Sequence, residues 1–224
     1  MEEIRLIEVK EEILSDNTKQ AAEVRERLRK TRTMLLNLMS SPGSGKTSLI
    51  LQTIEGLAGD LRLGVIEADI DSTVDAEKVA ARGIRAIQLR TGGFCHLDAG
   101  MVTQGIDAID ACEFDLVIIE NVGNLVCPAE FDTGAHKNVM ILSVPEGDDK
   151  PLKYPLMFSV CDLLLVNKID YLSLSNFDIA ALRKRVLALN PGILILEVSC
   201  KTGVGIKSWI DWLKAEVAAF KGLE

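Results

Sequence analysis

The sequence predicts an α/β fold in which a mostly parallel central sheet is flanked by helices on both faces. Seven short apolar runs alternate with helical patterns, and Gly, Pro or Asp residues bound the runs. Continuous apolar runs of this length are typical of strands buried on both faces, as in a parallel sheet between helix layers. No repeat, low-complexity tract or Pro/Gly-rich linker divides the 224 residues, so one main domain is expected.

The expected elements follow one another in a regular order. Residues 11–31 combine charges with apolar residues at helical spacing, which predicts an amphipathic helix, and we treat 1–32 as an extension of the main domain at 33–224. The expected strands are 34–39, 63–69, 86–89, 115–120, 138–144, 162–167 and 193–199. A last helix is expected at 204–220, where core packing explains the two tryptophans better than a binding stripe does.

The composition excludes several classes of function. A net charge of -8 and a pI near 5.0, with no long Lys/Arg run, argue against a nucleic-acid partner. No stretch approaches the roughly 18 to 20 apolar residues that cross a bilayer. Five cysteines do not form an even disulfide framework, and the acidic N-terminus lacks the order of a signal peptide. We therefore expect a cytoplasmic protein without nucleic-acid or membrane partners.

The segment 40-SSPGSGKTSLI-50 follows the first expected strand and fits a phosphate-binding loop at Gly45, Lys46 and Thr47, with Ser40 in place of the usual opening glycine. Glycines let backbone N–H groups turn toward phosphate oxygens, and the next helix directs its positive end at them. The lysine would bridge the outer phosphates and the threonine hydroxyl would bind Mg²⁺. The simpler alternative is a Gly/Ser loop that caps a helix. The predicted nucleotide contacts here are Gly43, Ser44, Gly45, Lys46, Thr47 and Ser48, and the predicted fold becomes a three-layer P-loop NTPase.

Two acidic residues end apolar strands where a second Mg²⁺ ligand is expected. Asp69 ends the run 63–69, and Glu120 ends the run 115–120, three residues before Gly123. In such sheets ligands bind at the carboxyl ends of the strands, so we predict catalytic and Mg²⁺ roles for both acids. The Gly123 N–H would meet the γ-phosphate. The alternative is that both are ordinary strand-end acids.

The base is predicted to be guanine. Asn167, Lys168 and Asp170 follow an apolar strand, and a carboxylate at the last position accepts both N1–H and N2–H₂ of guanine, whereas adenine offers an acceptor at N1. A second segment, 199-SCKTG-203, resembles a loop whose backbone N–H groups approach guanine O6, with a cysteine where alanine is usual. It adds Ser199, Cys200 and Lys201 to the predicted nucleotide contacts.

The segment 91-TGGFCHLDAG-100 places Cys95 and His96 side by side in a chain with two histidines. Thiolate and imidazole suit Zn²⁺ or Ni²⁺. Adjacent residues of a strand point in opposite directions, so a shared ion requires a bend, which Gly92-Gly93 permits. The alternatives are packing of a buried thiol and a Cys–His nucleophile, which the geometry of neighbouring residues disfavours. The remaining cysteines, Cys112, Cys161 and Cys200, are predicted to be packing residues, and His136 a loop residue.

Together these motifs resemble the HypB family of hydrogenase nickel-incorporation GTPases, in the P-loop GTPase class that also holds the urease accessory GTPase. The resemblance covers residues 33–220 and is carried by SSPGSGKTS, DIDSTVDA, GGFCHLDA, IENVGNLVCPAEFD and EGDDKPLKYP. It implies GTP hydrolysis, GTP/GDP-dependent homodimerisation, and Zn²⁺ or Ni²⁺ bound by Cys95, His96 and Cys127. It also implies nickel delivery to the hydrogenase large-subunit precursor, alongside a nickel-binding accessory protein.

Some features of the chain qualify this resemblance. Residues 1–32 contain neither Cys nor His, so the N-terminal nickel site or store of some members is not expected. Asn124 follows Gly123 where many GTPases carry a glutamine that positions water, which predicts slow turnover. Asp75 is a candidate for positioning that water. Lys150 and Lys153 could reach the nucleotide of a second subunit, or they could be ordinary solvated lysines.

Two rival functions share the nucleotide motifs. A urease-type nickel GTPase would carry a Cys-Pro-His triplet, whereas Cys127-Pro128 is followed here by Ala129. A regulatory GTPase switch would use Cys95, His96 and Cys127 only as structural residues. Stoichiometric metal binding that depends on the nucleotide would separate these alternatives.

Overall fold

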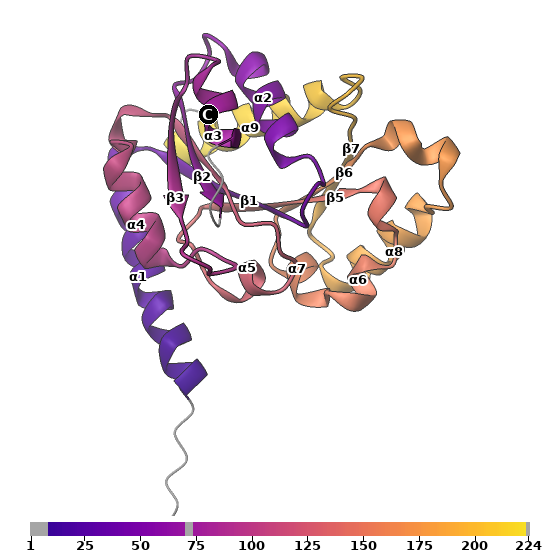
Figure 1. Ribbon diagram of the computed structural model, residues 1–224, viewed down its shortest axis with the longest axis horizontal. Helices are drawn as coiled ribbons and strands as arrows, with labels where there is room; N and C mark the ends of the chain where they lie inside the picture. The colour runs from indigo at the N-terminus through magenta and orange to yellow at the C-terminus, as the bar shows by residue number, and fades with distance from the viewer. Residues whose placement is uncertain (1–8, 70–73, 223–224) are drawn as a thin grey trace, which may run out of the picture.

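The central sheet contains seven strands that all pair in parallel, in the order β3-β2-β4-β1-β5-β6-β7 (Figure 1). The computed structural model describes residues 9–69 and 74–222, and the side chains of 14–69 and 77–222. The strands are β1 (Met34–Ser40), β2 (Leu63–Asp69), β3 (Arg85–Arg90), β4 (Leu116–Glu120), β5 (Lys137–Ser143), β6 (Leu163–Asn167) and β7 (Leu194–Glu197). Every predicted strand is present with its ends shifted by at most two residues, so the parallel α/β prediction is confirmed.

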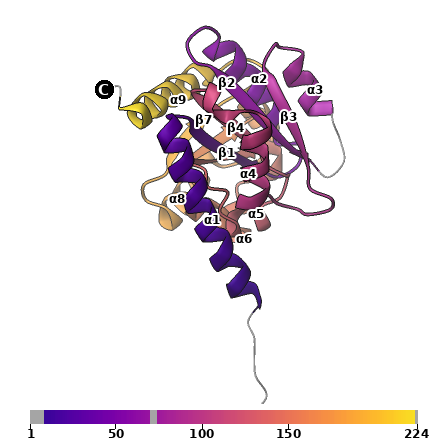
Figure 2. The same cartoon turned by 90° about the vertical axis from the view of Figure 1, so that its left-hand side faces the viewer.

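Helices cover both faces of the sheet, which confirms the three-layer arrangement (Figures 1 and 2). One face carries α2 (Lys46–Leu57), α3 (Val74–Ala80) and α9 (Ile206–Lys221). The other carries α1 (Val9–Thr31), α4 (Ala99–Ala108), α5 (Cys127–Glu130), α6 (Lys150–Lys153), α7 (Pro155–Ser159) and α8 (Ile179–Leu189). Three 3-10 turns, η1 (Ala111–Glu113), η2 (Val144–Glu146) and η3 (Ile169–Leu174), complete the described elements. None of the described helices combines the length and apolar character needed to cross a membrane.

The helix that follows the phosphate loop is fixed by the core. Leu36 and Leu38 of β1 pack with α2 and α9 in one continuous apolar cluster. The indole of Trp209, which is buried in α9, donates a hydrogen bond of 2.8 Å to the Thr53 hydroxyl of α2. A Cβ at Gly56 would lie 2.7 Å from Ile210, so the two helices approach closely. The C-terminal half of α2, the helix that begins at the phosphate loop, is therefore packed closely against α9.

Helix α1 packs against the rest of the fold over residues 17–28. Ala21, Val24 and Leu28 are buried, and the latter two belong to the apolar cluster that includes α4 and β4. His136, a loop residue as predicted, accepts a hydrogen bond of 3.0 Å at Nδ1 from the Leu35 N–H of β1. Burial lowers the pKa of His136 to about 4, which keeps this nitrogen free to accept. The N-terminal helix is thus joined to the sheet through apolar packing.

Candidate nucleotide and metal sites

A cavity of about 540 Å³ opens at the carboxyl ends of β1, β2 and β4. Residues from the phosphate loop, the end of β2 and the loop after β4 line it together. The lining consists of Pro42, Gly43, Gly45, Lys46, Thr47, Ser48, Glu67, Ala68, Asp69, Lys78, Gln88, Glu120, Asn121, Val122 and Gly123. Parallel α/β sheets bind ligands at this edge, so the cavity lies where the sequence predicted a phosphate site.

The loop before α2 requires its glycines. Gly43 and Gly45 have φ angles of 74° and 107°, in the left-handed region that side chains rarely adopt. A Cβ at Gly45 would lie 2.4 Å from the Asn167 side-chain nitrogen. Lys46 is buried, and its ammonium donates a hydrogen bond of 2.9 Å to the hydroxyl of Ser40. The residue that replaces the usual opening glycine thus holds the lysine that the sequence predicts to bind phosphate.

The predicted Mg²⁺ ligands lie close together. The Thr47 hydroxyl donates a hydrogen bond of 3.0 Å to Oε1 of Glu120, and Asp69 lines the same cavity. Hydroxyl and carboxylate oxygens are the ligands that Mg²⁺ prefers, so this oxygen set fits the ion. A Cβ at Gly123 would lie 3.0 Å from Pro42, which presses the loop after β4 against the phosphate loop. Asp75 lies in α3, but its side chain is outside the described ones.

Sequence reasoning missed seven of the residues that line this cavity, among them the polar side chains of Glu67, Gln88 and Lys78. Glu67 of β2 is in register with both Gln88 of β3 and Glu120 of β4, so the three form one row across the cavity floor. Lys78 reaches the cavity from α3. The alternation along β2 could have indicated Glu67, because it lies two residues before Asp69 and on the same face. No local pattern indicates Gln88, since its role depends on the strand order.

A second cavity, of about 340 Å³, lies beside the first and shares Gly45 and Ser48 with it. The predicted guanine-binding residues line it: Asn167, Lys168, Asp170, Cys200 and Lys201, with Pro145 and Tyr171. The Asn167 amide donates a hydrogen bond of 2.9 Å to the Ser44 carbonyl and accepts one of 3.3 Å from the Cys200 N–H. This one side chain therefore connects the phosphate loop with the loop after β7.

Hydrogen bonds also fix the acidic group of this second cavity. The Ser199 hydroxyl donates a bond of 2.6 Å to Oδ1 of Asp170, which orients the carboxylate. The Lys168 ammonium donates a bond of 2.7 Å to the Gly43 carbonyl. Burial raises the pKa of Cys200 to about 11, so its thiol stays protonated and it packs partly buried against the core, as predicted. The carboxylate is thus available to accept two N–H groups of a guanine ring.

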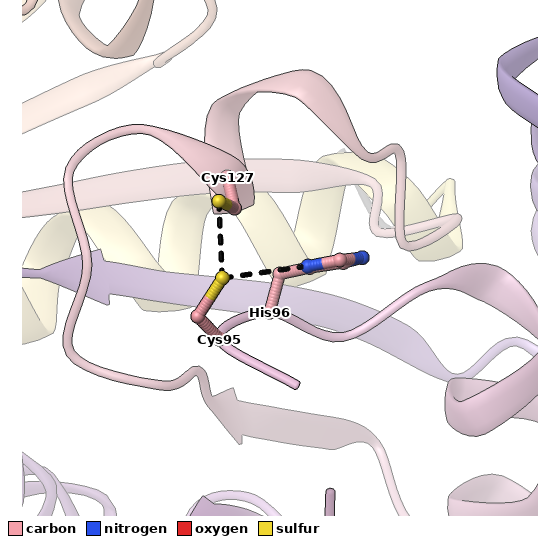
Figure 3. Close-up of side chains that lie close together, drawn as sticks. All are labelled: Cys95, His96 and Cys127. Atoms are coloured by element: carbon pink, nitrogen blue, oxygen red, sulfur yellow. Dashed lines mark hydrogen bonds between the residues drawn. The ribbon is translucent and has the colours of Figure 1, made fainter. Parts of the chain in front are cut away.

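Cys95 and His96, on the loop between β3 and α4, come together with Cys127, the first residue of α5 (Figure 3). The two sulfurs are 3.1 Å apart, the Cys95 sulfur is 4.0 Å from His96 Nδ1, and all three donor atoms lie within 4.8 Å of one another. Donor atoms around a tetrahedral Zn²⁺ are about 3.5 to 3.8 Å apart, so the set fits such an ion after small adjustments. The bend at Gly92-Gly93, with φ angles of 63° and 103°, brings the adjacent pair into this arrangement.

The surroundings of the cluster suit metal binding. The His96 ring stacks on Phe131 with 3.8 Å between centroids, and burial lowers the pKa of His96, so it is a neutral ligand near pH 7. The adjacent Cys95 sulfur and partial burial raise the pKa of the Cys127 thiol, so a bound metal must displace a proton there. Cys161 is buried as predicted. The prediction that Cys112 packs was wrong, because it lies exposed on η1 at the end of α4.

Asn124 joins the two ligand-bearing loops. Its amide donates a hydrogen bond of 3.3 Å to the Cys95 carbonyl and accepts one of 2.9 Å from the Val126 N–H. The chain from Glu120 to Cys127 therefore begins at the phosphate cavity and ends at the cysteine cluster.

The two lysines of the EGDDKPLKYP segment lie on α6, away from both nucleotide cavities of the described chain. Lys153 forms an ion pair of 2.6 Å with Asp149, which raises the pKa of the lysine. Lys150 lies 5.8 Å from the ring centre of Tyr154. Neither contact involves the nucleotide site of the same chain.

The fold and the phosphate cavity define a P-loop nucleotide-binding protein, and comparisons with known proteins narrow the class. The family described as "CobW/HypB/UreG, nucleotide-binding domain" matches residues 34–197. The hydrogenase maturation factor HypB of Azotobacter vinelandii is 46% identical over 212 residues, covering 95% of this chain and 70% of that one.

Two solved structures have the same fold over nearly the whole chain. HypB from Helicobacter pylori, solved in complex with nickel, aligns with a TM-score of 0.87 and 38% identity over 91% of this chain and 96% of that one. The hydrogenase maturation factor HypB from Archaeoglobus fulgidus aligns with a TM-score of 0.85 and 38% identity over 91% and 99%. The chain belongs to the HypB family of hydrogenase maturation GTPases.

Proposed function

We propose that this GTPase is a metallochaperone in which the state of the nucleotide controls how tightly a nickel or zinc ion is held. One observation carries the proposal: Cys127, which faces Cys95, lies only seven positions after Glu120, which is bonded to Thr47 at the phosphate loop. A change at one end of so short a segment displaces the other. Order–disorder of such loops is the way GTPases transmit the presence of the γ-phosphate.

On the nucleotide side, the proposed roles follow the residues of the two cavities. Lys46 would neutralise the outer phosphates, and the Gly123 N–H would meet the γ-phosphate. Thr47, Asp69 and Glu120 would hold Mg²⁺, which offsets phosphate charge when bound. Turnover should be slow because Asn124, engaged with Cys95 and Val126, is not available to orient water. Asp75 is proposed for that task.

In the second cavity, the residue proposed to recognise the base is Asp170, which would accept hydrogen bonds from guanine N1–H and N2–H₂. Asn167 would keep the loops of the site together, and the Lys168 side chain would cover the base. Ser199, Cys200 and Lys201 would close the pocket, with the Cys200 N–H near the base oxygen.

On the metal side, the proposed ligands are Cys95, His96 and Cys127, and the ion is the cargo. Two thiolates and a neutral imidazole suit Ni²⁺ and Zn²⁺. The Helicobacter pylori relative is described in complex with nickel, which supports nickel as the ion. Three protein donors leave a position open for water, for a second copy of the chain or for a receiving protein. Hydrolysis would relax the loop after Glu120 and loosen the ion.

The proposed partners follow from this cargo. A nickel-binding accessory protein would exchange the ion, and the hydrogenase large-subunit precursor would receive it. GTP would favour a homodimer in which Lys153 of one subunit reaches the nucleotide of the other. The free thiols require a reducing compartment, which supports a cytoplasmic location.

Metal titration in defined nucleotide states tests the proposal. Ni²⁺ affinity and stoichiometry would be measured with GDP and with a non-hydrolysable GTP analogue, in the wild type and in Cys95→Ala, with molecular mass followed by light scattering. We expect the affinity to differ between the two states by at least about fivefold, a typical coupling, and Cys95→Ala to abolish the difference. Identical binding in both states would instead favour a regulatory switch with a structural Cys/His cluster.

A further inference from the structure

Helix α1 contacts both loops that carry the proposed metal ligands, and it does so through one side chain. The Asn17 amide donates a hydrogen bond of 2.9 Å to the Asp132 carbonyl, five residues after Cys127. Its oxygen accepts a bond of 2.8 Å from the Ala99 N–H, three residues after His96. Asn17 therefore bridges two segments that are 33 residues apart in the sequence.

The bridge lies in a region shielded from water. Asn17 is 7% exposed and Ala99 is 0% exposed. Ala99 is the first residue of α4, so its N–H lacks a partner within the helix, and Asn17 supplies one. The side chain of Asp98 caps the same helix at the Met101 N–H, at 2.7 Å. The turn that carries Cys95 and His96 is therefore anchored where it enters α4.

A second α1 residue secures the other loop. Arg25 donates hydrogen bonds to Oδ1 of Asp132, at 2.5 Å, and to the Ala135 carbonyl, at 3.1 Å. A Cβ at Gly134 would lie 2.6 Å from Val24, so this loop follows the helix surface closely. The segment that follows α5 is thus fixed to α1. Of the three α1 residues Asn17, Val24 and Arg25, Asn17 is the one that also bonds to the turn after His96.

We propose that Asn17 is a positioning residue of the metal site, setting the separation of its two ligand loops and thereby the affinity for the cargo ion. The inference rests on the metal ligands of the proposed function, not on its nucleotide coupling. Removing a group that is hydrogen-bonded to a metal ligand itself typically changes metal affinity by about 10- to 100-fold. Asn17 bonds to backbone groups three and five residues from the ligands, so the lower end of that range is expected for it. By this account α1 is a part of the metal site rather than only a support for the sheet.

The test compares Asn17→Ala, Asn17→Asp and a control on the same helix, Leu28→Ala, all in the full chain bound to GDP. Leu28 is 2% exposed and packs in the apolar cluster, but it belongs to no hydrogen bond with either loop. Its truncation therefore lowers stability without releasing the bridge. Asn17→Asp keeps an acceptor for Ala99 and loses the donor to Asp132, which breaks the bridge at one end.

Ni²⁺ affinity is measured by titration, the Co²⁺ absorption spectrum reports ligand geometry, and the melting temperature reports stability. We expect Asn17→Ala to weaken Ni²⁺ binding by about tenfold or more and to alter the Co²⁺ spectrum, with a loss of several-fold for Asn17→Asp. Leu28→Ala should lower the melting temperature but keep the Ni²⁺ affinity within about twofold of the wild-type value, a smaller change than that expected when a group that orients ligands is removed.

Wild-type affinity in both Asn17 variants, or an equal loss in Leu28→Ala, would overturn the inference. If Asn17→Ala does not fold, Asn17→Asp decides the outcome. If the Cys95→Ala variant binds Ni²⁺ as tightly as the wild type, both the proposed metal site and this inference are overturned. Metal binding that is insensitive to the nucleotide would contradict only the coupling, because all these measurements use the GDP state.

Discussion

The proposed base pocket and the proposed metal site both lie beyond the carboxyl ends of strands of the same sheet, but they are held in different ways. In the proposed base pocket the groups that we expect to recognise the base are already fixed, since Asn167 bonds two loops and Ser199 orients Asp170. In the metal site the donor atoms of Cys95 and Cys127 face one another at 3.1 Å. Their positions depend on bridges from residues outside the cluster.

This difference indicates that one site recognises the base, whereas the metal affinity of the other responds to movement of its loops. A pocket whose polar groups are satisfied by one another keeps its shape and reads the base in every state. A site divided between two loops changes when either loop moves, and one of these loops also lines the phosphate cavity through Gly123. We therefore expect changes in the base pocket to affect nucleotide affinity alone and changes near Cys127 to affect metal affinity.

The largest effect is expected from Gly45→Ala. The new Cβ would lie 2.4 Å from the Asn167 amide, which would have to leave its bond to Ser44, and a φ of 107° adds backbone strain. Overpacking and left-handed strain together cost about 4 kcal/mol, which corresponds to about a thousandfold loss of GDP affinity. Isothermal titration with GDP measures it.

Gly59→Ala is the matched control, because Gly59 has a φ of 84° but no atom within 4 Å of the added Cβ. It should lower stability slightly and leave GDP affinity unchanged. Metal affinity measured without nucleotide should survive in both variants. Equal loss of GDP binding in the two would show that a general loss of stability, rather than the contact with Asn167, decides the effect.

Cys127→Ala should weaken Ni²⁺ binding by about a hundredfold, because removing a direct ligand costs at least as much as removing a group that orients one. GDP affinity should stay within a factor of about two, an effect below 0.5 kcal/mol. Cys112→Ala removes an exposed thiol and controls for loss of a cysteine. Retention of tight Ni²⁺ binding in Cys127→Ala would exclude this residue as a ligand.

Metal affinity should rise with pH while GDP affinity stays nearly constant. The pKa of Cys127 is raised, so its thiol is protonated near neutral pH and gives up a proton to the metal, whereas the lowered pKa of His96 leaves it neutral there. Each thiol proton released makes the apparent affinity rise about tenfold per pH unit, or about 30-fold between pH 6.5 and 8.0. Ni²⁺ titrations across this range measure the slope, and a flat profile would argue against thiolate ligation.

The smallest effect is expected from Ser199→Ala, which removes the hydroxyl that orients Asp170 at 2.6 Å. The carboxylate remains, so GDP affinity should fall only by about fivefold, equivalent to about 1 kcal/mol for one hydrogen bond. Ni²⁺ affinity should not change. A simultaneous loss of Ni²⁺ affinity would show that the base pocket and metal site are less separate than their contacts indicate.

Much of the fold was predictable because its signals are local. Apolar runs such as 63–69 mark buried strands, and the segment 40-SSPGSGKTSLI-50, with its two glycines, marks the phosphate loop. The adjacent Cys95 and His96 indicated a metal site through their chemistry. The residues that we propose recognise the base lie directly after a strand, where sheet topology places ligand contacts.

The remaining features depend on contacts between distant residues. Asn17 meets Ala99 and Asp132 across 82 and 115 positions, and no local pattern reports such a bridge. Gln88 reaches the phosphate cavity only because β3 lies beside β2, which follows from the strand order. The exposure of Cys112 was equally hidden, since an apolar thiol does not reveal on which side of a 3-10 turn it lies.

The most direct test of the account is the affinity for a non-hydrolysable GTP analogue, measured with and without saturating Ni²⁺. If the segment from Glu120 to Cys127 couples the two sites, Ni²⁺ must change the analogue affinity by the same factor by which the analogue changes Ni²⁺ affinity. We predict a matching factor of at least about fivefold, and its loss in Cys127→Ala. Analogue affinity that is identical with and without Ni²⁺ would contradict the coupling.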